Sequence, residues 1–402
     1  MKKWRSFYLG ILVPALLVGL GLWNPFKKAV AREGSKAPRF IVDPFWPKPL
    51  PAPGGHQWVT GEPGGSCIDS MDHVITVNRG FQTGGLTGQD GTTAIGSPPV
   101  IEYDPEGNVV RAWGDESKNR DDGSNAVMPN GIHGCFVDYQ DNIWIAGNGD
   151  GVVQKWSHDG KNLLMTIGTK RLCDGPVVAS RTMNKTCGSP GFNSSKTLLN
   201  DPADVAVDPD PDPITGQRGS VYIADGYGNY RVVVFSSTGK YLRQWGEPGN
   251  GPGQFGAPDG GHPHCVVLGK DGLVYACDRN NSRIEVFDKT GHLQRIIPVN
   301  IPTDLMLLGN LGTLRATDVD FSIDRHQTWM YDTDLGNNAV WIFDRARGVI
   351  VSGFGHSGHM AGEFIFPHTL AVASNGDLYV AETINGRRIQ KFVKSDNEDD
   401  GD

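Results

Sequence analysis

The sequence lacks an excess of positive charge, a haem-attachment motif and, after its N-terminal segment, any long hydrophobic run. The formal net charge is -8 and there is no stripe of Lys and Arg, which argues against nucleic acid as a partner. No Cys-x-x-Cys-His motif occurs, so covalently bound haem is not indicated. The apolar runs are only a few residues long and are therefore typical of short strands rather than helices.

The chain is rich in residues that end strands and form turns. It contains 54 Gly and 26 Pro among 402 residues, without a linker or a change of composition along the folded part. The roughly 370 residues after the N-terminal segment exceed the usual size of a single hydrophobic core. A repeated architecture explains this length better than two separate domains.

Residues 1–31 have the order of features of an export signal. A basic start precedes the apolar run Phe7–Trp23, and Ala29–Ala31 offers a cleavage site of small residues. An uncleaved membrane anchor is the alternative. In both cases we expect the folded part to be exported, in the periplasm or outside the cell. The acidic residues 394–402 are predicted to form a disordered tail.

Six cysteines in an exported chain permit disulfide bonds. Cys173 and Cys187 flank a polar insertion and are predicted to pair. Cys135, Cys265 and Cys277 fall inside predicted strands, where we expect small buried thiols rather than bridges.

A unit of four short strands recurs between residues 39 and 393. In its clearest copy the strands cover 133–138, 142–146, 152–156 and 164–168. The other copies open with the strands 204–208, 265–268, 318–321 and 370–372, and the first copy covers 67–114. Four strands in about 40 to 50 residues are typical of a propeller blade. The repeat therefore predicts an all-β fold, a six-bladed β-propeller.

The last copy lacks its fourth strand, because little but the acidic tail follows Phe392. Arg39–Asp43, which precede the first copy, are expected to supply that strand and to close the ring. A seven-bladed ring is the alternative, and it would require further strands within the Gly-rich and Thr-rich loop 80–97 of the first copy.

Three histidines occupy one position of the repeat, at the start of the innermost strand, in every second copy: His133, His264 and His368. The innermost strands line the central channel, so alternate blades bring these imidazoles to one mouth of it. Three His ligands with an open fourth position form the catalytic type of zinc site. Any one of them alone would more often be an ordinary core residue. His356 and His359 lie among Gly and Ser and are interpreted as solvated.

Arginines at the start of the third strand recur in several copies, as Arg231, Arg283 and Arg388. Their recurrence indicates a structural role in ion pairs with the aspartates of the repeat. By contrast, Arg79, Tyr227 and Arg279 each occur once, at the end of a second strand. Departures from the repeat's own pattern are where function is expected, so these three are candidate catalytic residues.

Together these residues give the chain a family resemblance between about Phe40 and Phe392. It resembles the NHL-repeat six-bladed propellers, and most closely the peptidyl-α-hydroxyglycine α-amidating lyases. The matching segments are Gly131-Ile-His133-Gly, Pro263-His264-Cys-Val, Phe366-Pro-His368-Thr-Leu, Asp225-Gly-Tyr227, the Arg-Gly pair at Arg79 and the Asp-Arg pair at Arg279.

The resemblance implies that the three histidines bind zinc and that Tyr227, Arg79 and Arg279 are catalytic. It implies a lyase that cleaves the C–N bond of a carbinolamide, such as a peptidyl-α-hydroxyglycine, to give an amide and glyoxylate. The family's acidic residue after the third histidine, which helps to hold calcium, is Thr369 here, which argues against a calcium site. Phe366 stands where the family has Met, and Gly228 where it has Cys.

Two other functions fit a propeller of this kind. A lactonase-like or esterase-like hydrolase would act at the same mouth, although such sites usually hold calcium with carboxylate and Asn ligands. A non-catalytic NHL propeller would bind a protein or a glycan on its face. For the lyase we expect a small-molecule or peptidyl substrate and a monomeric protein.

Overall fold

The computed structural model describes residues 36–79, 94–114, 127–175, 186–188, 191–256, 262–299, 301 and 315–395. The predicted export signal 1–31 and most of the acidic tail lie outside these residues. Within the described part, no helix is both long and apolar enough to cross a membrane.

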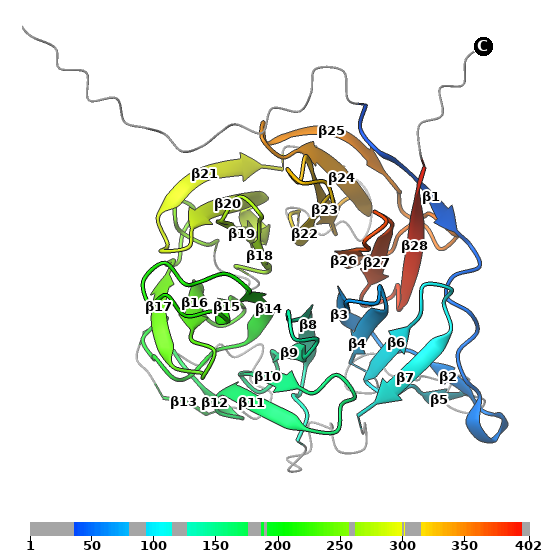
Figure 1. Cartoon of the computed structure of the whole chain (residues 1–402), viewed down its shortest axis with the longest axis horizontal. Helices are drawn as coiled ribbons and strands as arrows, with labels where there is room; N and C mark the ends of the chain where they lie inside the picture. The colour runs from blue at the N-terminus through cyan, green and yellow to red at the C-terminus, as the bar shows by residue number, and fades with distance from the viewer. Residues whose placement is uncertain are drawn as a thin grey trace, which may run out of the picture.

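The fold is a six-bladed β-propeller, as the repeat predicted (Figure 1). Each blade is a four-stranded antiparallel sheet whose first strand faces the central axis. In the sixth blade the outermost strand comes from the N-terminal end of the chain. The first three blades are β3 (Pro63–Ile68), β4 (Val74–Asn78), β6 (Val100–Tyr103) and β7 (Val109–Trp113); β8 (Ile132–Val137), β9 (Ile143–Gly147), β10 (Val152–Trp156) and β11 (Leu163–Gly168); and β14 (Pro202–Asp208), β15 (Ser220–Asp225), β16 (Arg231–Phe235) and β17 (Tyr241–Trp245).

The remaining blades are β18 (Val266–Leu268), β19 (Leu273–Asp278), β20 (Arg283–Asp288) and β21 (Leu293–Pro298); β22 (Asp318–Phe321), β23 (Trp329–Asp334), β24 (Ala339–Asp344) and β25 (Val349–Phe354); and β26 (Pro367–Val372), β27 (Leu378–Glu382), β28 (Arg388–Ser395) and β1 (Arg39–Asp43). Two short parallel pairs lie outside the blades: β2 (Gln57–Val59) with β5 (Ala94–Gly96), and β12 (Leu172–Cys173) with β13 (Thr186–Cys187). The 3-10 turns are η1 (Pro53–Gly55) and η3 (Arg279–Asn281).

The N-terminal strand β1 closes the ring by completing the last blade. It pairs antiparallel with β28, from Arg39 opposite Ser395 to Asp43 opposite Lys391. Strand β28 thus extends two residues into the segment that was predicted to be tail. The predicted closure of the ring is confirmed. The pairing of β1 with β28, here called the latch, holds the two ends of the propeller together in one sheet (Figure 1).

The hydrophobic core is a ring of apolar clusters between neighbouring blades. Each of six clusters of buried side chains combines residues of two adjacent blades; Val74 and Tyr103 of the first blade, for example, meet Tyr379 and Ala381 of the sixth. Burying the apolar face of every blade against the next one lets the chain grow beyond single-core size, because each interface is a small core of its own.

The recurring arginines have the structural role that their recurrence predicted. Arg231 and Arg283 pair with the aspartates that end the preceding strands, through Nε at 2.9 Å from Asp225 Oδ2 and at 2.7 Å from Asp278 Oδ2. Arg388 makes the same contact with Glu382. These ion pairs fix the turn between the second and third strands of their blades.

The cysteines depart from the prediction. The expected pair Cys173–Cys187 is confirmed, but the other four are also disulfide-bonded, as Cys67–Cys135 and Cys265–Cys277. The expectation of free thiols at Cys135, Cys265 and Cys277 is therefore wrong. Ring closure places the innermost strands β3 and β8 side by side, which brings the Cα atoms of Cys67 and Cys135 to 5.5 Å, within the range of a disulfide.

Candidate metal centre

Three buried histidines converge on the central axis at one end of the channel. His133 and His368 are the second residues of β8 and β26, and His264 lies two residues before β18. Their ring centroids are 4.8 to 4.9 Å apart, and one ring nitrogen from each lies within 4.8 Å of those of the other two. The predicted convergence of the three imidazoles is present in the structure.

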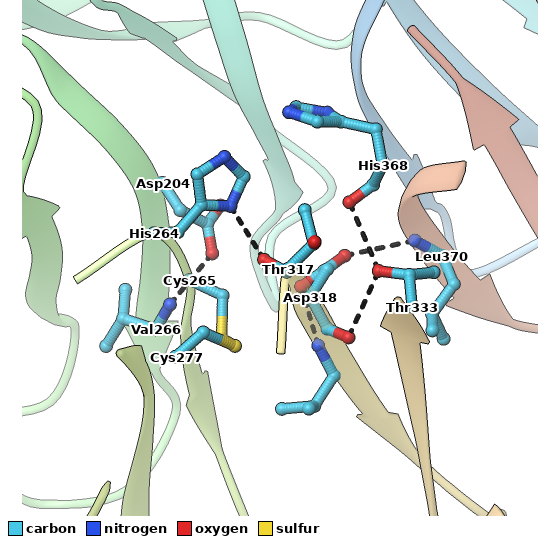
Figure 2. The surroundings of a disulfide bond; sticks show 11 residues. Asp204, His264, Cys265, Val266, Cys277, Thr317, Asp318, Thr333, His368 and Leu370 are labelled. Carbon is cyan, nitrogen blue, oxygen red and sulfur yellow. Dashed lines mark hydrogen bonds between the residues drawn. A yellow bond between two sulfur atoms is a disulfide. The ribbon is translucent and has the colours of Figure 1, made fainter. Parts of the chain in front are cut away.

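Two of the three imidazoles, those of His133 and His264, are oriented by hydrogen bonds to the blade that follows them in the ring. Nδ1 of His133 donates to the carbonyl oxygen of Ala203 at 2.7 Å, and Nδ1 of His264 donates to that of Thr317 at 2.6 Å (Figure 2). The corresponding neighbour of His368 is the backbone of Gly64. Because a carbonyl oxygen can only accept, the proton of the neutral ring lies on Nδ1 in His133 and His264, and the Nε2 lone pair is left to face the axis.

Glycine makes this close approach of the blades feasible. A Cβ atom at Gly134, directly after His133, would lie 2.6 Å from Cα of Asp204 and 2.7 Å from the carbonyl oxygen of Ala203. A Cβ atom at Gly64 would lie 2.4 Å from the carbonyl oxygen of Ile132. The small residues around His133 thus set how closely its strand meets both neighbouring blades.

Burial keeps the three imidazoles neutral. It is the main cause that lowers the pKa of each ring well below the usual value. The positive charge of Arg279 lowers the pKa of all three rings further, and that of Arg79 does so for His133 and His368. Neutral imidazole is the form that binds metal ions.

Tyr227 reaches the same point from the loop after β15. Its hydroxyl oxygen lies 3.1 Å from Nε2 of His133, 3.0 Å from Nε2 of His264 and 3.2 Å from Nη1 of Arg279. Gly226 holds this loop against the strand that carries His264, since a Cβ atom there would lie 2.0 Å from the carbonyl oxygen of Pro263.

The two candidate arginines flank the histidines and have different partners. Arg279, the first residue of η3, lies with its guanidinium carbon 5.4 Å from the ring centroid of Tyr227. Arg79 follows β4 and donates from Nη1 to Glu62 at 3.1 Å and from Nε to the carbonyl oxygen of Ile132 at 3.0 Å. Glu62 was not identified from the sequence; its position directly before the first innermost strand was the signal that could have found it.

Below the histidines the channel contains buried carboxylates. A cavity of about 170 Å³ is lined by inner-strand residues of all six blades, among them Asp204, Asp318 and Thr369. Asp204 and Asp318 accept backbone N–H groups of the next blade, from Val266 and Leu370 (Figure 2). The hydroxyl of Thr369, which stands where the family has an acidic residue, lies 3.0 Å from that of Ser66.

Comparisons with known proteins find NHL-repeat proteins and amidating enzymes. A family model described as NHL repeat matches residues 261–287, the segment that carries His264 and Arg279. NHL repeat-containing protein 3 of Homo sapiens is 26% identical, over 96% of this chain and 94% of that protein. The peptidylglycine alpha-amidating monooxygenase of Rattus norvegicus is 29% identical over 56% of this chain, which spans only 20% of its length.

A probable peptidyl-alpha-hydroxyglycine alpha-amidating lyase of Caenorhabditis elegans is 23% identical over 64% of this chain and 63% of that protein. Among solved structures, a streptogramin B lyase aligns with a TM-score of 0.53 at 12% identity, covering 90% of this chain and 100% of that chain, which supports the fold alone. The chain is thus a six-bladed β-propeller with one segment that matches the NHL-repeat model, and it resembles NHL-repeat proteins and the peptidyl-α-hydroxyglycine α-amidating lyases.

Proposed function

We propose that the protein is a zinc-dependent lyase that cleaves the C–N bond of a carbinolamide, such as a peptidyl-α-hydroxyglycine, to give an amide and glyoxylate. The observation that carries this proposal is the position of the Tyr227 hydroxyl, within 3.2 Å of two of the converging histidines and of Arg279. The similarity to amidating lyases supports the same reaction class.

The donor set fits zinc. His133 and His264 present Nε2 lone pairs toward one point, and their Nδ1 atoms are held by backbone carbonyls, as is usual for zinc-bound histidine. His368 supplies the third imidazole, and three such ligands leave a position for substrate. A zinc ion there would act as a Lewis acid on the substrate hydroxyl and make its proton easier to remove.

Tyr227 is placed to be the general base. Its oxygen lies among the imidazoles, where it can take the proton of the substrate hydroxyl. The adjacent guanidinium of Arg279 stabilises the phenolate form by its positive charge. When the hydroxyl has lost its proton, the C–O bond becomes a carbonyl, the C–N bond breaks, and the electron pair goes to the amide nitrogen, which takes a proton back from Tyr227.

Arg79 is assigned to the substrate carboxylate. A guanidinium binds a carboxylate in a two-pronged manner, and Glu62 and the Ile132 carbonyl fix the orientation of this one. Its charge acts on His133 and His368, so a carboxylate bound to Arg79 would be close to these two histidines.

Glyoxylate release from a peptidyl-α-hydroxyglycine tests the proposal. The zinc-loaded protein is expected to release glyoxylate, and His133→Ala is expected to lose this activity. His359→Ala is the matched control, because His359 is an exposed histidine outside the strands of the blades. Zinc-loaded wild-type protein without turnover, or equal turnover in His133→Ala, would contradict the proposed reaction.

Export is also proposed, and the disulfides support it. All six cysteines are paired, which is typical of oxidising compartments such as the periplasm or the extracellular space. Cell fractionation of the full-length protein checks this, and recovery of a reduced form in the cytoplasm would contradict it.

A further inference from the structure

A second cluster of metal-ligand side chains lies at the joint between the first and second blades. Asp69 follows β3, Glu102 lies in β6 and His158 follows β10, and one ligand atom of each lies within 4.8 Å of those of the others. Strand β3 begins beside His133 and runs about 15 to 20 Å before it reaches Asp69. The cluster is therefore at the opposite end of the blades from the three histidines.

The distances between these ligand atoms match a zinc site. Oδ2 of Asp69 lies 3.4 Å from Nε2 of His158, and Oε2 of Glu102 lies 3.5 Å from the same nitrogen. Zinc bonds of 2.0 to 2.2 Å in a tetrahedron place neighbouring ligand atoms about 3.3 to 3.6 Å apart. The same separations are too long for good N–H···O hydrogen bonds, which are about 2.7 to 3.2 Å.

The tautomer of His158 leaves a lone pair facing two carboxylates. Nδ1 of His158 donates to the carbonyl oxygen of Asp141 at 2.9 Å, so the neutral ring has no proton on Nε2. That nitrogen is buried and has no hydrogen-bond partner among the described residues. A lone pair that faces carboxylate oxygens at these distances is repelled by them, and a positive charge between these atoms, either a metal ion or a proton on Nε2, removes the repulsion.

Asp69 gives an independent indication of a cation. Its side chain is completely buried, and its Oδ1 accepts the backbone N–H groups of Met71 and His73, each at 2.8 Å. Its Oδ2, which faces His158, has no hydrogen-bond partner within the described part of the chain, and Nδ1 of His73 lies 3.5 Å from it. A buried carboxylate oxygen without a partner is costly, and a metal ion at this point would satisfy it.

Glu102 is held in position from two sides. Its Oε1 accepts from Nδ1 of His73 at 2.8 Å, and its Oε2 accepts from Nη1 of Arg111 at 2.9 Å. Arg111 thus pairs with Glu102, whereas the ion-pair neighbours of Asp69 within the described residues are the imidazoles of His73, at 3.5 Å, and His158, at 3.4 Å. Two carboxylates and an imidazole are donors that zinc accepts, whereas calcium requires oxygen ligands.

We propose that Asp69, Glu102 and His158 bind a second zinc ion, which joins the first two blades at the end of the ring opposite the candidate active site. The ion replaces the missing contacts of Asp69 Oδ2 and His158 Nε2 and ties the β10–β11 turn to the inner strand of the first blade. This second site is structural and does not depend on the lyase reaction.

Zinc counting in a variant without the first site tests the proposal. After chelation and reloading with zinc chloride, the wild-type protein is expected to hold two zinc ions per chain, and His133→Ala about one. The double variant His133→Ala/His158→Ala is expected to hold none. Asp69→Asn, a gentler change, replaces His158→Ala if that variant does not fold.

Thermal unfolding gives the second readout. Zinc chloride is expected to raise the Tm of His133→Ala but not of the double variant, and calcium chloride is expected to raise neither. The matched control is His133→Ala/His292→Ala, because His292 also contacts an aspartate, at 3.1 Å, but is exposed. Loss of all zinc in His133→Ala alone, or equal zinc content with and without His158, would overturn the second site whatever the outcome of the glyoxylate assay.

Discussion

Nδ1 of His133 donates to the carbonyl oxygen of Ala203 at 2.7 Å, although the two residues are 70 positions apart in the chain. Ala203 lies in the next blade, near the start of its innermost strand, as Thr317 does relative to His264. The repeat therefore supplies His133 and His264, the ligands of the second and fourth blades, with a backbone acceptor from the following blade. Correct orientation of the imidazoles requires that neighbouring blades keep their spacing.

Gly134→Ala is expected to weaken zinc binding without touching a ligand. The new Cβ atom would lie 2.6 Å from Cα of Asp204, so the second and third blades must move apart and the bond between His133 and Ala203 is strained. We expect a loss of about 1 to 3 kcal/mol in the free energy of unfolding. Zinc titration checks the affinity. Gly191→Ala is the control, because its Cβ atom would meet nothing within 4 Å; equal zinc affinity in both variants would refute this account.

Tyr227→Phe is expected to lower kcat for glyoxylate release about 100-fold to 10,000-fold while zinc content stays at the wild-type level. The ring remains, but the oxygen that lies 3.0 Å from His264 Nε2 is removed. Steady-state kinetics with metal analysis separates the loss of a base from the loss of the ion. Tyr139→Phe, at an exposed tyrosine, is expected to be silent. Wild-type kcat in Tyr227→Phe would exclude the proposed base.

Removal of the Cys265–Cys277 disulfide is expected to affect both stability and the metal site. Cys265 follows His264, and the backbone N–H of His264 donates to the carbonyl of Cys277 at 2.8 Å, so the bridge holds the ligand strand in place (Figure 2). The double Ser variant is expected to lose about 3 kcal/mol and to bind zinc more weakly.

The matched control is the double Ser variant at Cys173 and Cys187. The disulfide that it removes closes a loop of similar length, 14 residues against 12. It is expected to lose comparable stability and to keep zinc affinity, because it lies outside the blades. Unfolding curves and zinc titration measure both effects. An equal fall of zinc affinity in the two variants would show that general destabilisation, and not the position of His264, is the cause.

Because β1 closes the ring, we expect substitutions at two neighbouring residues of this strand to differ in their effect on the free energy of unfolding. Phe40 packs on the rings of Tyr331 and Phe354, with centroids 5.5 and 5.4 Å away, whereas Ile41 points to solvent and is 64% exposed. Phe40→Ala is expected to cost about 3 kcal/mol and Ile41→Ala almost nothing. Chemical denaturation checks the difference, and equal midpoints would mean that β1 does not stabilise the ring.

The sequence predicted the features that the repeat carries and missed those that ring closure creates. The period of the strands predicted six blades, the unpaired last blade predicted the β1 latch, and the alternation of His133, His264 and His368 predicted their convergence, because equivalent positions of a closed ring must face one axis. The pair Cys67–Cys135 could not be predicted, since its members belong to different blades. Asp69 recurs in the repeat, as Asp138 and Asp208, but His158 does not, so its approach to Asp69 and Glu102 appears only in the structure.

The pH dependence of stability is expected to carry the signature of Asp332. Burial, together with the charges of Asp334 and Asp318, raises the pKa of this carboxyl well above its usual value, and neither of its oxygens has a hydrogen-bond partner in the part of the chain that the structure describes. The folded state therefore holds its proton at a pH where the unfolded chain has lost it. The contribution of this group to the free energy of unfolding is fully present below about pH 4. It falls by about 1.4 kcal/mol for each pH unit as the pH rises toward the raised pKa.

Asp332→Asn removes the ionisable group at similar size. Its Tm is expected to equal that of the wild-type protein near pH 4 and to exceed it increasingly toward pH 8. At the higher pH only the wild-type protein must either bury a charged carboxylate or keep the carboxyl protonated, and both cost free energy. The control is Asp159→Asn, at a carboxyl whose pKa is held low by Lys161 and Ser157 on the surface, and it is expected to show no such rise. A Tm difference that is independent of pH would mean that Asp332 is already paired in solution.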